Sequence, residues 1–204
     1  MFKNIFKNKK VLITGHTGFK GSWLTTWLLD LGSSVIGVSK DIPTKPSNFE
    51  ELELEKKIKH HQLDIRDYNK ISQIISQEKP DFIFHLAAQA IVSTSYNEPV
   101  ETVSTNVMGT CNILDALKNS NHKCSAIIIT SDKAYDNIEQ IWGYRESDSM
   151  GGKDIYSGSK GAAELIIKSY FHSFFKQKKS NVRISVARAG NVIGGGDWAK
   201  DRIV

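Results

Sequence analysis

The chain has 204 residues, of which 40% are hydrophobic and 24% are charged, the composition of an ordinary globular protein. Its formal net charge is +5, but no basic motif is interleaved with aromatic residues, so the charge predicts a solvated surface and no nucleic-acid partner. No apolar run approaches the about 18 residues of a membrane span, and no signal-peptide core is present. Cys111 and Cys124 are expected to be free thiols, and a cytoplasmic location is expected.

The first predicted element is a buried strand over Lys10–Thr14, followed by a glycine-rich turn and by an apolar-periodic helix over Ser22–Leu31. This order builds a dinucleotide site, because glycines let the backbone approach a pyrophosphate and the helix N-terminus favours its negative charge. A glycine-rich turn without a ligand is the alternative. The predicted cofactor contacts in this turn are Gly15, Thr17, Gly18, Phe19 and Gly21.

A second strand is predicted over Ser34–Ser39, and the residue at its end should meet the adenosine ribose. An acidic residue there favours NAD, whereas a basic residue accommodates the phosphate of NADP. Ser39, Lys40 and Asp41 point both ways, so NAD is expected and NADP stays open. On the preceding helix, Trp23 and Trp27 are expected to pack against the sheet.

Residues 41–57 are predicted to form a surface loop followed by a short acidic turn or helix. The third strand ends after His60 and His61, which lack metal-ligand spacing and are expected to be a surface pair, so no metal site is predicted. Asp64 and Ile65 follow at the strand end where the adenine should lie. Asp67 is a candidate N-cap for the next helix.

A fourth buried strand over residues 81–88 runs into small residues, which let a cofactor approach the backbone; Leu86, Ala87 and Ala88 are assigned to it. Asn106 lies on a long helix predicted from Pro99 to Leu117. The strand over residues 125–131 delivers polar groups at its carboxyl end, the edge where ligands collect in such sheets; these groups are Thr130, Ser131, Asp132 and Lys133.

Tyr156 and Lys160 are four residues apart in a helix predicted from Asp154 to about Phe175, so both side chains lie on one face. A free phenol titrates near pH ~10, and a neighbouring positive charge favours the phenolate. The pair is therefore a candidate base near neutral pH. Alone, a Tyr-x3-Lys spacing is common and more often structural.

A sixth strand is predicted over Val182–Ala187, so strands and helices alternate along the chain. This alternation predicts an α/β fold with a doubly wound parallel sheet of the Rossmann type. Residues 1–190 are expected to form the dinucleotide-binding domain. Residues 191–204 are expected to begin a substrate-binding region that is largely absent from this chain.

The order of these motifs resembles the extended short-chain dehydrogenase/reductase family, in the branch that acts on nucleotide sugars. Within that branch the sequence is most similar to the CDP-glucose 4,6-dehydratases. The matching segments are Gly15-x-x-Gly18-x-x-Gly21, Asp64-Ile65, residues 85–89, residues 106–110, Thr130-Ser131-Asp132-Lys133, Tyr156-x3-Lys160, Arg188-x-Gly190-Asn191 and residues 194–198.

The resemblance implies that NAD stays bound and is regenerated in each cycle. Tyr156, assisted by Lys160 and Ser131, would take the proton of the sugar 4-hydroxyl while hydride leaves C4. Water would then leave from C6 with Asp132 as general acid, and hydride would return to C6. By the same resemblance Gln89, Ser131 and Asn191 contact the substrate, although a loop amide bonded to local backbone is the alternative for Gln89 and Asn191.

Lys133 stands where related dehydratases carry a glutamate that takes the C5 proton. It can act as a base only if burial or a nearby cation lowers its pKa from ~10. Alternatively it positions Asp132 or stabilises an enolate, or it is an exposed lysine at a strand end.

The resemblance further implies a nucleotide-diphosphate sugar as substrate and a homodimer joined through a four-helix bundle. Apolar residues on more than one face of the helix over residues 154–175 fit packing on both the sheet and a partner. Family members continue for well over a hundred further residues. A nucleotide-sugar 4-epimerase or reductase, or a catalytically inactive dinucleotide-binding fragment, are the competing interpretations.

Overall fold

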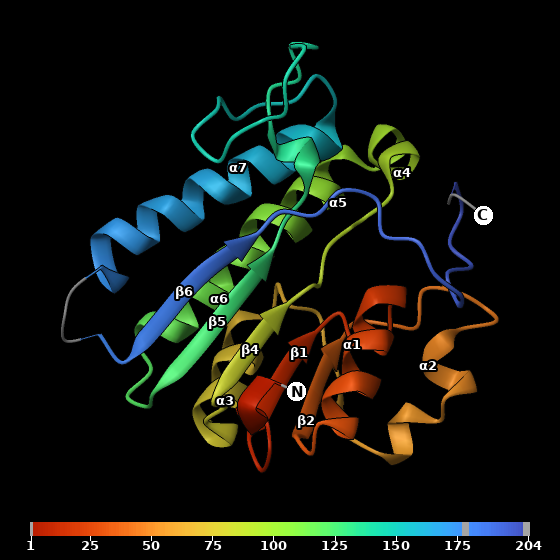
Figure 1. Ribbon diagram of the computed structural model, residues 1–204, viewed down its shortest axis with the longest axis vertical. Coiled ribbons are helices and arrows are strands. Elements are labelled where there is room, and N and C mark those ends of the chain that lie inside the picture. Colours follow the sequence, from red (N-terminus) through yellow and green to blue (C-terminus); the bar gives the residue numbers. More distant parts are fainter. Residues whose placement is uncertain (1, 177–179, 202–204) are drawn as a thin grey trace.

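The computed structural model describes residues 2–176 and 180–201, and a six-stranded parallel sheet lies at its centre (Figure 1). The strand order is β3-β2-β1-β4-β5-β6. Because the order reverses between β1 and β4, a crevice for ligands forms at their carboxyl ends. The predicted doubly wound parallel sheet is confirmed. The strands are β1 (Lys10–Thr14), β2 (Ser34–Ser39), β3 (Lys59–Gln62), β4 (Phe82–His85), β5 (Cys124–Ile129) and β6 (Val182–Ala187).

Helices connect the strands, and among the described residues none is both long and apolar enough to cross a membrane. Local sequence determines several helix starts: the side chains of Ser47, Asp67 and Asp154 each accept a backbone N–H of the first turn. The helices are α1 (Phe19–Asp30), α2 (Asn48–Glu51), α3 (Tyr68–Glu78), α4 (Val92–Asn97), α5 (Pro99–Val103), α6 (Gly109–Lys118) and α7 (Ile155–Tyr170), with short 3₁₀ turns at Phe2–Asn4, Leu54–Lys56 and Asp132–Ala134.

The sheet is packed on both faces, since neighbouring residues of β1 belong to different apolar clusters. Leu12 lies in the larger cluster, which α3, α6 and α7 complete through residues such as Ile71, Ile113 and Ile167. Val11 and Ile13 lie in the smaller cluster together with Leu28 of α1. The continuous apolar strands therefore reflect a sheet buried on both sides, as parallel sheets require.

The predicted helix from Pro99 to Leu117 is confirmed as a continuous right-handed segment, but it contains a π-turn. The π-turn spans Ser104–Met108 between α5 and α6 and carries the buried Asn106. A second π-turn, Phe171–Phe175, extends α7 to the predicted end. π-turns are frequent at functional sites because they redirect a side chain that a regular helix would place elsewhere.

The prediction that Trp23 and Trp27 pack against the sheet is wrong. Both indoles face outward from α1 with 50% and 45% of their surface exposed. The face of α1 toward the sheet instead buries small residues, Gly21, Ser22 and Thr25, which permit close helix–sheet approach. Trp23 donates from Nε1 to the carbonyl oxygen of Gly195 at 2.8 Å, so it holds the segment that follows β6.

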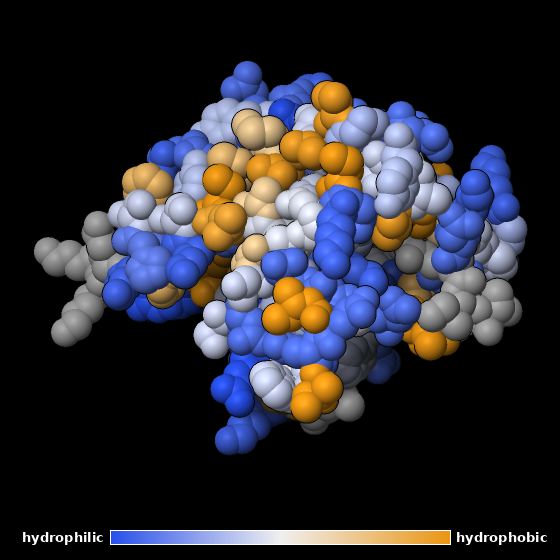
Figure 2. All heavy atoms as spheres, turned by 90° about the horizontal axis from the view of Figure 1, so that it is seen from above, coloured by the Kyte–Doolittle hydropathy of each residue, from blue (hydrophilic) through white to orange (hydrophobic). Residues whose placement is uncertain are grey.

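The segment after β6 runs across the carboxyl edge of the sheet toward α2 and α4 (Figure 1). Besides the Trp23 contact, its Asp201 carboxylate accepts a hydrogen bond from Ser93 Oγ of α4. At the same end, the loop over residues 135–150 projects beyond the sheet and exposes Ile138, Ile141 and Trp142. Seen from above in Figure 2, apolar side chains reach this end in separate groups surrounded by hydrophilic ones.

Candidate active site

The glycine-rich turn between β1 and α1 is a cradle made of backbone. Gly15 has a φ of +76°, and a Cβ there would lie 2.7 Å from the amide nitrogen of Ala87. A Cβ on Gly21 would lie 2.1 Å from the carbonyl oxygen of Gly15, so α1 packs directly on the turn. α1 begins at Gly18 without a side-chain cap, which leaves its first-turn amides to an external anion. These features fit a dinucleotide pyrophosphate.

A buried imidazole fills the space beneath this turn. His16 is fully buried; its Nδ1 lies 3.0 Å from Ser39 Oγ and its Nε2 lies 2.7 Å from His60 Nδ1. Burial, followed by the charge of His60, lowers the pKa of His16 to about 4, so the ring is neutral at pH 7. The expectation of a surface histidine pair is therefore wrong for His60. Among the described residues no cluster of metal-ligating side chains is found.

Thr17 fixes the turn to the end of β2. Its amide donates to Ser39 Oγ at 3.3 Å, and its hydroxyl donates to the carbonyl oxygen of Asp41 at 2.6 Å. The hydroxyl is thus engaged within the protein, whereas the predicted role was contact with the cofactor. Phe19 is the first residue of α1. Its ring lies close to Gly194 of the segment after β6, since a Cβ added at Gly194 would be 3.3 Å from the ring.

The end of β4 is held against the glycine turn by a buried chain of hydrogen-bonding groups. His85 Nδ1 lies 2.7 Å from Thr14 Oγ1, which accepts a hydrogen bond from the amide of Ala87 at 3.2 Å. His85 Nε2 lies 3.1 Å from Thr110 Oγ1. Burial lowers the pKa of His85 to about 3, with a smaller contribution from Lys160. Together with the bond from the Leu86 amide to the carbonyl oxygen of Thr14, this chain holds the backbone after β4 against the glycine-rich turn.

Asn106 connects the β4 loop with α7. Its Oδ1 accepts from the Gln89 amide at 2.8 Å, and its Nδ2 donates to Gln89 O at 3.1 Å and to Ser159 Oγ at 2.8 Å. The Gln89 side chain bonds to Ile91 in both directions and donates to Thr102 Oγ1 at 2.8 Å. In this structure, therefore, Gln89 makes the local loop contacts that were the alternative to substrate binding.

Tyr156 and Lys160 lie side by side in the first turns of α7. Both side chains are buried, and Lys160 Nζ lies 5.7 Å from the centroid of the Tyr156 ring. Burial, followed by the charge of Lys20, lowers the pKa of Lys160 to about 8. The ammonium is therefore still the main form at pH 7, and it lies where it favours a phenolate.

The end of β5 brings three candidate residues to the crevice. Ser131 donates from Oγ to Asp132 Oδ1 at 3.0 Å and accepts from the Lys133 amide at 3.2 Å. Asp132 and Lys133 are exposed, whereas the preceding strand is covered. Gly190 approaches the same place, since a Cβ there would lie 3.6 Å from Asp132 Oδ2. Asn191 is exposed and comes directly after Gly190, the residue that lies near Asp132.

Two polar networks were not predicted from the sequence. In the first, buried Glu164 of α7 accepts from Thr130 Oγ1 at 2.6 Å and from Arg188 Nε and Nη2 at 2.8 and 2.6 Å. The Arg188 guanidinium also lies 4.5 Å from the centroid of the Tyr135 ring. The sequence hinted at this network only through the position of Glu164, which lies one helical turn beyond Lys160 on the same face of the helix.

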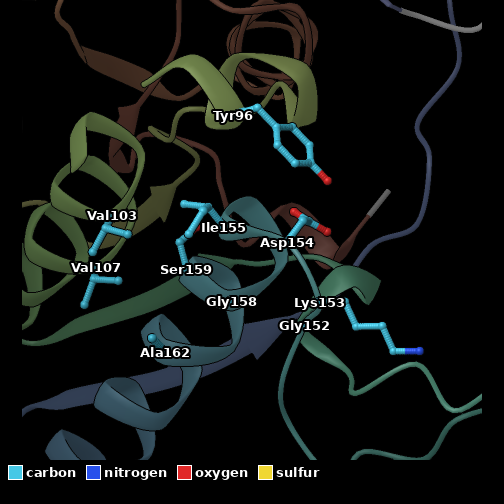
Figure 3. A pocket seen from close by; sticks show the side chains of 10 residues that line it. All are labelled: Tyr96, Val103, Val107, Gly152, Lys153, Asp154, Ile155, Gly158, Ser159 and Ala162. Carbon is cyan, nitrogen blue, oxygen red and sulfur yellow. The ribbon is translucent and has the colours of Figure 1, made fainter. Parts of the chain in front are cut away.

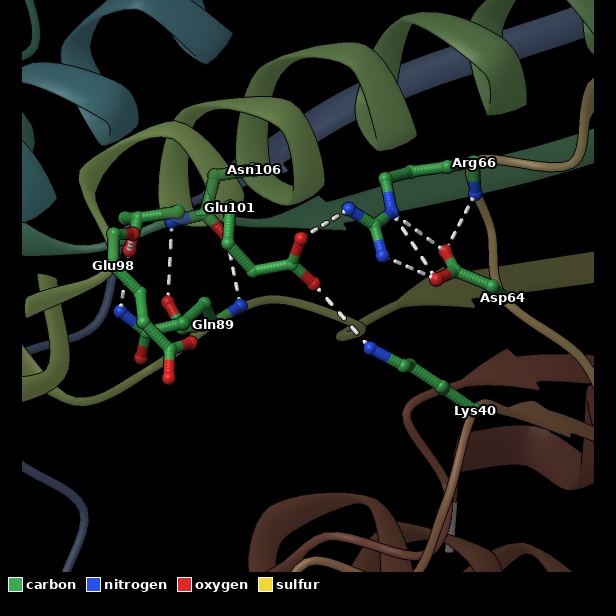
Figure 4. A network of polar contacts seen from close by, with 8 residues as sticks. Lys40, Asp64, Arg66, Gln89, Glu98, Glu101 and Asn106 are labelled. Atoms are coloured by element: carbon green, nitrogen blue, oxygen red, sulfur yellow. Dashed lines mark hydrogen bonds and ion pairs between the residues drawn. The ribbon is translucent and has the colours of Figure 1, made fainter.

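The second network lies at the ends of β2 and β3 (Figure 4). Asp64, predicted to meet the adenine, accepts hydrogen bonds from the Arg66 side chain at 3.1 and 2.6 Å. Arg66 also reaches Glu101 of α5, and Glu101 reaches Lys40. The hydrogen bond from Arg66 is the main cause that lowers the pKa of Asp64. Ile65 lies buried beside it, where its side chain would contact a Cβ at Gly109.

An open hollow of about 360 Å³ lies between α4, the π-turn of Asn106 and the start of α7. Figure 3 shows its lining: Tyr96 from α4, Val103 and Val107 from the helix through the π-turn, and Ile155 from α7. Neither Tyr156 nor Lys160 lines this hollow, so it is distinct from the place where that pair lies.

The six-stranded parallel sheet and the glycine cradle between β1 and α1 are those of the extended short-chain dehydrogenase/reductase fold. The family model described as GDP-mannose 4,6 dehydratase matches residues 12–186, and the chain belongs to this family.

The relatives of known function include nucleotide-sugar dehydratases and epimerases. CDP-glucose 4,6-dehydratase of Salmonella typhimurium is 50% identical, over 99% of this chain and 57% of the relative. CDP-paratose 2-epimerase of Salmonella typhi is 30% identical, over 93% of this chain and 59% of the relative. The chain thus spans somewhat more than half the length of these relatives.

Solved structures agree in fold. An epimerase from Methanothermobacter thermautotrophicus superposes with a TM-score of 0.81 and 27% identity, over 95% of this chain and 55% of that chain. The dTDP-glucose 4,6-dehydratase of Streptomyces venezuelae, solved with NAD bound, gives a TM-score of 0.80 over 92% of this chain and 57% of that chain. At 21% identity the latter likeness concerns the fold alone.

Proposed function

We propose that this chain carries the cofactor-binding and catalytic part of a CDP-glucose 4,6-dehydratase, which converts CDP-glucose to CDP-4-keto-6-deoxyglucose. The observation that carries the proposal is the meeting of two groups at one crevice. Tyr156 and Lys160 are buried together on α7, and Ser131, Asp132 and Lys133 follow β5 at the carboxyl edge of the sheet, in a turn that packs against α7. The 50% identity to the Salmonella dehydratase supports the choice of reaction.

NAD is the proposed cofactor. When bound, NAD supplies the hydride acceptor of the oxidation and the hydride donor of the later reduction, so it is regenerated within one cycle. The proposed contacts begin with the glycine cradle and the first turn of α1, where the chain offers backbone amides without a side-chain cap. The other contacts proposed are Thr17, Phe19, Asp64, Ile65, Leu86, Ala87, Ala88, Asn106, Thr130, Tyr156 and Lys160.

The proposed proton transfers use groups on two elements. Tyr156 takes the proton of the sugar 4-hydroxyl, with Ser131 as a hydrogen-bonding partner. Lys160 stabilises the phenolate, because its charge is held 5.7 Å from the ring in a buried place. Asp132, exposed at the end of β5, is proposed to protonate the hydroxyl that leaves from C6.

Lys133 keeps more than one proposed role. Its side chain is exposed and its amide donates to Ser131, so the backbone of Lys133 fixes the serine whatever the side chain does. Because the exposed side chain lacks the burial that a lysine base needs, we propose that it supports Asp132 or stabilises an enolate. Asn191 and Gln89 remain proposed substrate contacts; Gln89 must first exchange its bonds to Ile91 and Thr102.

Residues 1–190 are proposed as the dinucleotide-binding domain and 191–204 as the beginning of the substrate-binding region. β6 ends at Ala187, which supports a boundary near this place; residues 202–204 lie outside the described part. Cys111 and Cys124 are both free thiols, which supports the proposed location in the reducing cytoplasm.

We also propose a homodimer. Two apolar stripes lie side by side on the outer helices around the hollow in Figure 3. The stripe on α7 consists of Ile155, Gly158, Ala162 and Leu165. The stripe on the helix through the π-turn consists of Val100, Val103 and Val107. Two copies that share this face would form a bundle of four helices with twofold symmetry.

The test is a chimera in which residues 1–204 replace the matching part of the Salmonella dehydratase. With CDP-glucose and NAD we expect the 4-keto-6-deoxy product, detected by its absorbance in base. Tyr156→Phe should lower turnover at least about 10²-fold, because the general base is lost, while NAD binding measured by calorimetry falls far less, because only one of many proposed cofactor contacts is removed.

The competing functions give other results in this chimera. NAD binding without product from CDP-, dTDP- or GDP-glucose would favour an inactive dinucleotide-binding module. Interconversion of sugars without loss of water would favour a 4-epimerase. Either result would overturn the dehydratase proposal.

A further inference from the structure

The end of β2 is followed by a cation and then by an acid, Lys40 and Asp41. Lys40 directly follows Ser39, the last residue of β2. In dinucleotide folds this position meets the adenosine ribose, and a cation there accommodates the 2′-phosphate of NADP. On that rule alone Lys40 favours NADP, whereas Asp41 favours the NAD proposed above.

An acid reaches this lysine from another element. Glu101 lies on α5, far from β2 in the sequence, and its Oε1 lies 3.3 Å from Lys40 Nζ. Its other oxygen, Oε2, accepts a hydrogen bond from Arg66 at 2.5 Å. Figure 4 shows the Glu101 carboxylate between these two cations, with Asp64 on the far side of Arg66.

The four side chains form an alternating row of charges, Lys40–Glu101–Arg66–Asp64. Hydrogen bonds from Arg66 are the largest cause that lowers the pKa of Glu101 and of Asp64, and the Asp64 contact raises that of Arg66, so these three groups are charged at neutral pH. The row has no net charge. Both cations of the row, Lys40 and Arg66, are therefore already paired.

We propose that Glu101 contributes to the selection of NAD over NADP, because from helix α5 it pairs with Lys40 and Arg66 and so keeps both cations from a 2′-phosphate. This inference rests on the proposed NAD function. A 2′-phosphate would have to take Lys40 or Arg66 from Glu101 and would then lie close to that carboxylate. The ribose hydroxyl of NAD carries no charge and can donate a hydrogen bond to a carboxylate.

The expected size of the effect follows from exposure. The side chains of Glu101 and Arg66 are 37% and 27% exposed, so water and salt screen the row in part. We expect Glu101→Gln to lower the ratio of the NADP dissociation constant to the NAD dissociation constant about tenfold. The change should come mainly from tighter NADP binding, because the substitution leaves two cations and one anion.

The experiment measures binding of NAD⁺ and NADP⁺ by calorimetry to the 204-residue chain and its variants, so it does not depend on turnover. Glu98→Gln is the matched control, because it removes the same charge three residues earlier, where the hydrogen bonds of Glu98 are made by its backbone. Adding Lys40→Ala to Glu101→Gln should return the ratio most of the way to that of the unaltered chain. Thermal melting identifies any variant that fails to fold.

The outcomes separate the inference from the function on which it rests. An unchanged ratio in Glu101→Gln, an equal change in Glu98→Gln, or a preference of the unaltered chain for NADP⁺ overturns the inference and leaves dinucleotide binding intact. An unaltered, folded chain that binds neither dinucleotide overturns the proposed function as well. A smaller change at high salt than at low salt supports the electrostatic origin of the selection.

Discussion

At the scale of single residues, Lys160 combines a buried position with a charge. Burial lowers its pKa from 10.5 to about 8, so the unfolded chain binds the proton more tightly than the folded chain. The unfolded state therefore holds more protons between about pH 8 and 10.5, and stability rises with pH in that window. Below pH 8 Lys160 is protonated in both the folded and the unfolded state, so the full free-energy cost of burying its charge is present. This cost is about 3 kcal/mol for a pKa shift of this size.

Replacing this lysine should therefore stabilise the fold while it removes the proposed support of the Tyr156 phenolate. We expect Lys160→Met to raise the free energy of unfolding at pH 7 by about 1–3 kcal/mol, since methionine fills a similar volume without a buried charge. Denaturant unfolding at pH 7 and pH 10 measures the effect, which should shrink at the higher pH. A variant less stable than the unaltered chain at pH 7 would contradict the assignment of Lys160 as a destabilising buried cation.

Sequence reasoning found the residues whose signal is local. Asp67 and Asp154 were identified as helix starts because an N-cap depends on the next three residues only. The His16–His60 contact and the Glu101–Arg66 pair were not found, since their partners are brought together by the sheet across 44 and 35 positions. Nothing in the sequence around either residue points to the other.

At the scale of elements, the Glu164–Arg188 pair joins α7 to the ends of β5 and β6. Its side chains are 6% and 16% exposed, so the pair is almost entirely removed from water. Breaking such a pair leaves one buried charge without its partner, which typically costs 3–5 kcal/mol. Because Thr130 shares the same carboxylate, the loss would act on the strand end that carries Ser131.

We expect Arg188→Met to lower the free energy of unfolding by about 2–4 kcal/mol, because the Glu164 carboxylate keeps only its bond from Thr130. The double variant Glu164→Leu/Arg188→Met should recover most of the loss, since no unpaired charge remains. Denaturant titration of the single and double variants gives the coupling free energy. Additive losses in the double variant would show that the pair does not act as a unit.

The strands were predicted well, because runs of apolar residues bounded by glycine and polar residues are read directly. The strand predicted over Val182–Ala187 has the same first and last residues as β6 in the structure. The short helix α4 was not predicted, since six residues carry too little periodicity. The π-turn was hidden because one extra residue in a turn barely disturbs the apolar pattern. Trp23 and Trp27 were misplaced because indole size suggested packing, whereas close approach to the sheet required small residues.

At the scale of the whole molecule, the exposed stripes on α7 and on the helix through the π-turn are the feature that a second copy would cover. Leu165 is 54% exposed at the centre of α7. We expect Leu165→Lys to shift the protein from dimer to monomer in sedimentation at micromolar concentration, since the symmetric contact brings two lysines together. Ile141→Lys is the control, because Ile141 is 95% exposed on the distant loop and should leave association unchanged. A monomeric unaltered chain would contradict the dimer.

The buried ring of His16 restricts which sequences can share this fold. A Cβ at Gly37 would lie 2.4 Å from the imidazole, so no other residue fits at position 37 while histidine occupies position 16. In relatives whose glycine-rich turn has a small residue in place of His16, position 37 is free to carry a larger side chain. The two positions, 21 residues apart and on different elements, should therefore change together during evolution, and a histidine introduced alone at position 16 of such a relative should prevent correct folding.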